Sequence, residues 1–197
     1  MQRAARGIGV NATLIGDSIR MAYEPLVIEK LSGRAEVWGP VECCGTSRDV
    51  LENLENWVLS RPGGVVHMNC GLHDLAMDSG EGNRVPLEEY VENLRAIVGR
   101  ISAESPARLV WATTTPVIDE WHRRVKPFLR READVLRYNA AALAVMREGE
   151  IEVNDLHEVI RRARPELCLR PDGVHVNEHG NVLLAEAVAA AIMALSL

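Results

Sequence analysis

The sequence predicts an α/β fold, a three-layer α/β/α sandwich around a five-stranded parallel sheet, and three observations support this prediction. Short apolar runs rich in β-branched residues alternate with longer segments of helical periodicity. Most of the short runs are apolar at nearly every position, as in strands that helices cover on both faces. Such alternation is typical of parallel sheets with right-handed crossovers. The length of 197 residues suits one core, so residues 1–197 are predicted to form a single domain.

Five short segments are the predicted strands. In chain order they are 13–16, 35–38, 65–70, 109–113 and 151–153. In a parallel sheet their carboxyl ends lie toward one edge, and ligands of such folds bind beyond that edge. Functional residues are therefore expected directly after these segments.

Helical periodicity fills the intervals between the predicted strands. Ser47 is the expected N-cap of the helix after the second strand, and Pro86 suits the first position of the next helix. Two further helices are predicted over 130–147 and 179–195, the last one alanine-rich and mostly buried.

Composition excludes several classes of function. With 22 Lys and Arg against 28 Asp and Glu, the net charge is −6, and no positive field exists to attract nucleic acid. No apolar stretch approaches the ~20 residues that span a bilayer, so no membrane association is expected, and the first ten residues lack the apolar core of a secretory signal. Cys43, Cys44, Cys70 and Cys168 show no metal-type spacing and are interpreted as reduced, mostly buried thiols. A cytoplasmic location is expected from this cysteine usage.

A serine follows the first predicted strand, in Gly16-Asp17-Ser18. A serine at a strand-to-helix junction faces the crevice, and the helix N-terminus favours an oxyanion there. The alternative is an ordinary N-cap serine. The Gly-x-Ser-x-Gly pentapeptide is absent, because Arg20 occupies the second glycine position.

An acid and an imidazole lie three positions apart near the C-terminus, as Asp172 and His175. A carboxylate at this spacing can hold one ring nitrogen and leave the other facing a serine hydroxyl. The alternative is a surface turn, since Asp172-Gly173 is a frequent turn pair.

Two glycine turns follow the second and third predicted strands, at Gly45 and at Gly71. Glycine lets a backbone N–H approach a substrate oxygen closely, and one such donor can change the rate by ~10²–10³. Each glycine taken alone favours the alternative, a simple turn.

Together these motifs resemble the SGNH hydrolases, also called the GDSL family. The resemblance rests on Gly-Asp-Ser after the first strand, Gly-x-x-Asp after the third and Asp-x-x-His near the C-terminus, and it runs from Leu14 to about Leu184. The segments 113–116 and 153–156, and the pair Tyr138-Asn139, also resemble parts of that family. The resemblance implies a flavodoxin-like SGNH hydrolase fold.

The resemblance also implies catalytic roles. Ser18 would be the nucleophile, His175 its general base and later acid, and Asp172 the carboxylate that orients His175. The backbone N–H groups of Ser18 and Gly45 would be two donors of an oxyanion hole.

The third donor of the family, an asparagine within Gly-x-Asn-Asp, is replaced here by His73. An imidazole can donate a hydrogen bond, but its side chain is longer and places the donor elsewhere. Asn69 is an alternative source of the donor. If neither residue serves, the enzyme would be slow or the site a binding remnant.

The expected function is therefore that of a serine esterase acting on short acyl esters, such as acetyl esters, of small polar alcohols or carbohydrates. A small-molecule ester is the expected partner, and no cofactor is implied. A non-catalytic SGNH-like protein that binds an acylated or sugar ligand is the alternative. No metal is expected: His175 and His179 are four residues apart, but no third ligand is evident.

One basic segment, 119–131, follows the fourth predicted strand and is expected to overhang the crevice. There Trp121 would stack on a sugar and the arginines would hold an anionic group; the alternative is a solvated surface loop. Arg20 and Arg48 lie in first helical turns and are expected to point outward.

Overall fold

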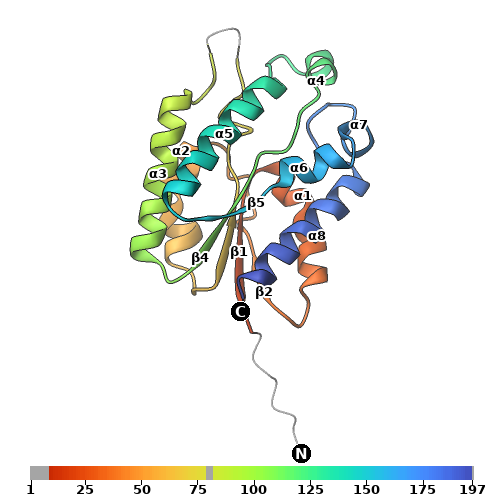
Figure 1. Ribbon diagram of the computed structural model, residues 1–197. Helices are drawn as coiled ribbons and strands as arrows, with labels where there is room; N and C mark the ends of the chain where they lie inside the picture. The colour runs from red at the N-terminus through yellow and green to blue at the C-terminus, as the bar shows by residue number, and fades with distance from the viewer. Residues whose placement is uncertain (1–8, 79–81, 197) are drawn as a thin grey trace, which may run out of the picture.

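The computed structural model describes residues 9–78 and 82–196 and confirms the α/β/α sandwich (Figure 1). Its sheet has five parallel strands in the order β2-β1-β3-β4-β5. The strands are β1 (Asn11–Ile15), β2 (Glu36–Trp38), β3 (Val65–Met68), β4 (Arg108–Ala112) and β5 (Glu152–Asn154). Each overlaps a predicted segment, and the bounds differ by no more than two residues at either end.

Helices cover both faces of the sheet (Figure 1). One layer contains α2 (Ser47–Glu52), the π-helical turn η1 (Glu55–Leu59), α3 (Leu87–Glu104) and α5 (Glu132–Glu148). The other contains α1 (Ser18–Lys30), α6 (Leu156–Arg162) and α8 (Glu178–Ala194). The short helices α4 (Asp119–Val125) and α7 (Pro165–Cys168) lie near the carboxyl ends of the strands. No helix in the described residues is long and apolar enough to cross a bilayer.

Two predicted helix starts were wrong by one residue. Thr46, not Ser47, is the N-cap of α2 and forms a capping box with Asp49. Ser47 is unable to cap because its hydroxyl donates to the buried Asp74 instead. Pro86 is the N-cap of α3 rather than its first helical residue.

The register of the sheet positions the site. β1, β3 and β4 pair in parallel, with Leu14 beside His67 and His67 beside Val110. These strands end at Ile15, Met68 and Ala112, so the loops that follow them leave the same edge of the sheet. The residues singled out in the sequence lie in these loops and in the turn before α8.

Candidate active site

The junction between β1 and α1 presents Ser18. Asp17 is the N-cap of α1, and its carboxylate accepts a hydrogen bond of 2.8 Å from the Ile19 N–H. Ser18 is therefore the first helical residue and not the cap, which leaves its hydroxyl free for another partner. The preceding Gly16 is needed for close packing, since a Cβ there would lie 2.7 Å from the Cβ of Arg20.

The structure brings Ser18, His175 and Asp172 together. Ser18 Oγ lies 3.0 Å from His175 Nε2, although the two residues are 157 positions apart. His175 Nδ1 lies 2.5 Å from Asp172 Oδ2. The three side chains thus form a continuous Ser-His-Asp chain of hydrogen bonds.

A tight turn holds the acid and the imidazole in place. Asp172 Oδ1 accepts hydrogen bonds from the backbone N–H groups of Val174, at 3.1 Å, and His175, at 3.0 Å. Gly173 has a φ of 70°, and a Cβ there would lie 2.5 Å from the Ile118 carbonyl oxygen. Burial opposes ionisation of Asp172, but the hydrogen bonds from the His175 ring and the two N–H groups outweigh it and lower the pKa of this carboxyl.

Two backbone N–H groups near the start of α1, those of Ser18 and Gly45, donate no hydrogen bond among the described residues. The Ser18 N–H belongs to the first turn of α1, where no helical carbonyl is available. Around Gly45, the N–H of Cys44 donates to the Gly16 carbonyl and that of Thr46 to Asp49. The Gly45 N–H takes no partner within the described part of the chain. Gly45 has a φ of 65°, and a Cβ there would lie 2.4 Å from Asp49 Oδ2, so this position requires glycine.

His73 lies in the loop after β3 and is half-buried. Its Nε2 lies 3.8 Å from the Cys43 thiol, which belongs to the loop that contains Gly45. Burial, more than any neighbouring charge, lowers the pKa of His73, so that the ring is neutral near pH 7 and carries one N–H.

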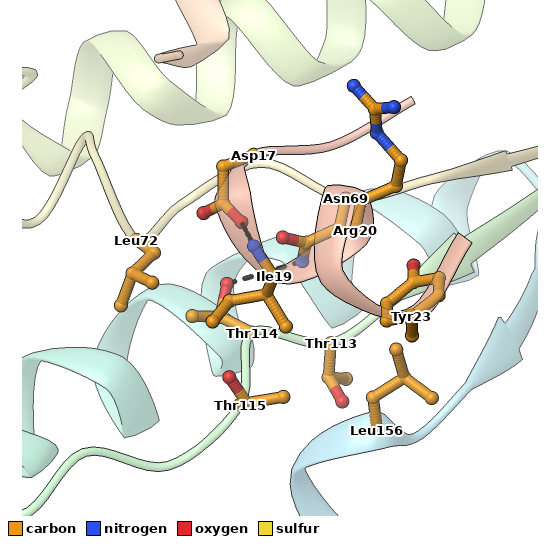
Figure 2. A pocket seen from close by; sticks show the side chains of 10 residues that line it. All are labelled: Asp17, Ile19, Arg20, Tyr23, Asn69, Leu72, Thr113, Thr114, Thr115 and Leu156. Carbon is orange, nitrogen blue, oxygen red and sulfur yellow. Dashed lines mark hydrogen bonds between the residues drawn. The ribbon is translucent and has the colours of Figure 1, made fainter. Parts of the chain in front are cut away.

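Asn69 is not available as the third donor, contrary to the alternative considered from the sequence. Its amide nitrogen donates to the Ala112 carbonyl at 2.7 Å. It also lies 3.4 Å from Thr114 Oγ1, to which it donates a second hydrogen bond (Figure 2). Both of its N–H groups are thus used to join the loops after β3 and β4.

A buried carboxylate joins the loops after β2 and β3, and sequence reasoning missed this link. Asp74 Oδ1 accepts hydrogen bonds from Ser47 N–H at 2.8 Å and Ser47 Oγ at 2.5 Å. The side chain is fully buried, and this burial raises the pKa of Asp74 to about 6 despite the bonds from Ser47. The only signal in the sequence was its place within Gly-x-x-Asp.

Arg20 does not point outward as expected; its side chain is buried beneath the start of α1. Its guanidinium pairs with Glu24 and donates to the Glu42 carbonyl at 2.8 Å. It therefore anchors the loop before Gly45 to α1. Arg48 is exposed and pairs with Glu89, as its predicted outward position allows.

Two hollows are lined by direct sequence neighbours of triad residues. A cavity of about 10 Å³ lies under the first turn of α1, between Ile19, Asn69 and Leu72 (Figure 2). It has room for about one water and none for an acyl group. A larger hollow of about 550 Å³ lies beside the turn that holds Asp172. Its lining residues are Trp121, Arg124, Val125, Glu166, Leu169 and Pro171.

The basic segment divides into an exposed and a buried part. Arg123 and Arg124 are solvent-exposed on α4, as the surface-loop alternative predicts. Arg130 is instead 6 % exposed. In the described residues no group of three or more His, Cys, Asp or Glu side chains is arranged to hold a metal ion.

Parallel α/β architecture with a Ser-His-Asp chain at the carboxyl edge of the sheet is the arrangement expected of serine hydrolases whose nucleophile follows the first strand. The acetyl xylan esterase AlAXEase superposes with a TM-score of 0.76 at 20% identity, over 93% of this chain and 100% of that one. A lipase/acylhydrolase from Enterococcus faecalis superposes with a TM-score of 0.76 at 19% identity, over 94% and 96%. At these identities the likeness concerns the fold.

Sequence similarity to curated proteins indicates which family the chain resembles. A GDSL esterase/lipase of Oryza sativa subsp. japonica is 26% identical over 121 residues, which are 57% of this chain and 46% of that protein. One of Arabidopsis thaliana is 32% identical over 115 residues, 53% of this chain and 47% of that protein. The chain thus matches about half the length of these relatives, and no family model matches it. The chain is thus similar in sequence to GDSL esterases/lipases, in agreement with the resemblance that its motifs indicated, and similar in fold to a lipase/acylhydrolase.

Proposed function

We propose that this protein is a serine esterase that hydrolyses short acyl esters of small polar alcohols or carbohydrates through an acyl-serine intermediate. The observation that carries the proposal is the hydrogen-bonded chain Ser18–His175–Asp172, with 3.0 Å between the hydroxyl and the imidazole. A hydroxyl is a weak nucleophile, and this arrangement supplies the base that activates it.

Catalysis would proceed in two half-reactions. Ser18 Oγ attacks the ester carbonyl while His175 Nε2 accepts its proton, and His175 then returns that proton to the departing alcohol. Water attacks the acyl-serine with His175 again as base, which releases the acid and restores Ser18. Asp172 holds the Nδ1–H of His175 and stabilises the imidazolium that forms in each half-reaction. No step of this sequence requires a cofactor.

Charge on the tetrahedral intermediate would be held by three donors. Two are the backbone N–H groups of Ser18 and Gly45, whose neighbours are bonded internally. The third is the neutral ring of His73 in the loop after β3, in place of the family's asparagine. Donors fixed in this way need no reorganisation during the reaction, which is the source of their effect on rate.

The preference for a small acyl group follows from the shape of the site. The cavity under the first turn of α1 holds about 10 Å³, which is too small for a long acyl chain. The hollow of about 550 Å³ beside Asp172 offers space for the alcohol, with Trp121 as a surface for a sugar ring. A structural neighbour described as an acetyl xylan esterase supports the same choice.

Labelling with a fluorophosphonate tests the proposal, because this probe phosphonylates an activated serine. We expect one equivalent of label per chain, none in Ser18→Ala, and release of acid from 4-nitrophenyl esters that falls as the acyl chain lengthens. Folded protein that neither takes up label nor hydrolyses any ester, yet binds acetylated sugars, would establish the non-catalytic alternative instead.

A further inference from the structure

A short strand-like contact fixes the segment before α5 to the loop after β3. Met77 and Leu129 exchange two backbone hydrogen bonds of 2.9 Å each. Next to this bridge, Arg130 Nε donates to the Leu72 carbonyl oxygen at 2.7 Å. Leu72 immediately precedes His73, so Arg130 is bound to the loop that presents the proposed third oxyanion donor.

Arg130 is a buried cation, and no carboxylate in the described part of the chain pairs with it. Its side chain is 6 % exposed, and none of the ion pairs among residues 9–78 and 82–196 includes it. Its guanidinium carbon lies 4.9 Å from the centre of the Phe128 ring. Arg84 lies at the same distance from that ring but is bound by Asp78 through two hydrogen bonds, at 2.6 and 2.8 Å.

The guanidinium of Arg130 is connected through two rings to the turn that holds Asp172. The Phe128 ring, 4.9 Å from the guanidinium carbon, packs edge-on against His122 with 5.3 Å between ring centres, and His122 Nδ1 lies 3.3 Å from the Asp172 carbonyl oxygen. The charges of Asp17 and Asp172 favour the Arg130 cation, and the charge of Arg84 opposes it. Asp17 already caps α1, and Asp172 is already bonded to His175 and two N–H groups. The negative charges of these two carboxylates reduce the free-energy cost of burying the Arg130 cation, but neither carboxylate pairs with it.

A buried charge is normally paired, because leaving water without a partner costs several kcal/mol. Burial lowers the pKa of Arg130, but an arginine stays protonated throughout the physiological range. The Nε–H is used by Leu72, and the described residues offer no partner to the two terminal nitrogens. The planar guanidinium group, with N–H donors that have no protein partner, has the geometry to bind the two oxygens of a carboxylate.

We propose that Arg130 is a specificity-determining residue whose guanidinium binds a carboxylate on the ester substrate. The inference rests on the proposed esterase function and deepens it: the preferred substrate is an anionic ester, with the carboxylate on its acyl or its alcohol part. The protein as a whole has a net charge of −6 and repels anions. A cation bound to the loop that carries His73 would overcome this repulsion for one class of substrate.

Two matched pairs of esters test the proposal on the full chain. In the first pair, 4-acetoxybenzoate is compared with its neutral methyl ester; in the second, 4-nitrophenyl hydrogen succinate is compared with 4-nitrophenyl valerate. We expect wild-type kcat/KM to be higher for the charged member of at least one pair. Arg130→Gln should lower that charged-to-neutral ratio ~10- to 100-fold, the range for a charged hydrogen bond.

Controls separate charge recognition from loss of structure. Arg131→Gln removes an exposed arginine one position away and should leave the ratio within about twofold of wild type. Arg130→Lys keeps the charge and should retain part of the preference even if Arg130→Gln folds poorly. Fluorophosphonate labelling of each variant reports whether Ser18 remains active.

Two results would overturn the inference while leaving the esterase proposal intact. One is a wild-type enzyme that hydrolyses neutral esters without favouring either charged ester. The other is an equal loss on charged and neutral esters in labelled, folded Arg130→Gln. Absence of label and of all ester hydrolysis in wild type would instead refute the esterase proposal, and the inference with it.

Discussion

At the scale of single residues, the helix cap, the nucleophile and the two oxygens of the orienting acid each have a separate hydrogen-bonding role. Asp17 caps α1, so the Ser18 hydroxyl is free to meet His175. Asp172 divides its two oxygens between the backbone turn and the imidazole. Because these hydrogen bonds lower the pKa of Asp172, the carboxylate stays ionised at neutral pH and continues to orient His175.

Replacing this carboxylate separates its structural and catalytic contributions. Asp172→Asn keeps an oxygen for the Val174 and His175 N–H groups, so the turn should survive. The amide is neutral and favours the wrong imidazole tautomer, and kcat should fall by ~10³- to 10⁴-fold. Steady-state kinetics measure the loss, and circular dichroism checks the fold. A variant with wild-type kcat would remove Asp172 from the mechanism.

The substitution at His73 tests whether an imidazole replaces the family's asparagine. If the ring donates to the oxyanion, His73→Asn restores a donor of the family's type, and kcat should stay within about threefold of wild type. His73→Ala removes the donor, and kcat should fall by ~10²- to 10³-fold. Both variants are assayed on one neutral acetyl ester. Equal losses in the two would show that the imidazole has a task that an amide is unable to perform.

At the scale of elements, the loops that carry the proposed oxyanion donors are held by side chains that lie outside the triad. Asp74 ties the loop after β3 to the start of α2, and Arg20 ties the loop after β2 to α1. Both are buried. The positions of the proposed donors at Gly45 and His73 therefore depend on polar contacts between loops as well as on the sheet.

The link through Asp74 should be visible in folding stability as a function of pH. Burial raises the pKa of Asp74 to about 6, so the folded chain holds this proton more tightly than the unfolded chain. Stability from this group is present below pH ~4 and is lost as the pH rises through about 6. The destabilisation caused by Asp74→Asn should thus be largest near pH 4 and smallest above pH 6. Urea unfolding of both proteins from pH 4 to 7 measures it, and a difference that does not change with pH would contradict the account.

The elements also show what the sequence was able to predict. Strands and long helices were recognised because the spacing of apolar residues indicates which face of an element is buried. The position of these elements in the fold depends mainly on that burial. Arg20 was misjudged because a charged residue in a first helical turn is usually solvated, and nothing local reveals the loop that buries it. Ser47 was misjudged for a similar reason: its distant partner, Asp74, takes the hydroxyl that would otherwise cap α2.

At the scale of the whole molecule, the order of the strands assembles the site. β1 pairs with β3, and β3 with β4, so the loops that contain Ser18, His73 and Thr114 leave one edge of the sheet. The turn before α8 brings His175 to Ser18 across 157 positions. The motifs predicted these partners through their family resemblance. For the basic segment 119–131, the sequence predicted only that its arginines would hold an anionic group, and the fold singled out Arg130 as the buried one.

The centre of the sheet contains a histidine that should make the whole fold acid-sensitive. His67 of β3 is fully buried, and its Nε2 accepts a hydrogen bond of 3.0 Å from the Asn154 amide of β5. Burial lowers the pKa of His67 to about 4, so the folded chain resists a proton that the unfolded chain accepts near pH 6.5. Stability is complete above pH ~6.5 and should fall by on the order of 3 kcal/mol as the pH drops through about 4.

His67→Gln keeps an acceptor for Asn154 and removes the titrating group, so it isolates this contribution. The free energy of unfolding, from urea titrations between pH 7 and 4, should decline more steeply in wild type than in the variant. The variant is therefore expected to be less stable near pH 7 and to approach wild type near pH 4. Asp74 titrates over part of the same pH range and changes the stability in the opposite direction. Because Asp74 is present in both proteins, its contribution cancels in the comparison. Parallel curves for the two proteins would mean that protonation of His67 does not drive acid unfolding of the sheet.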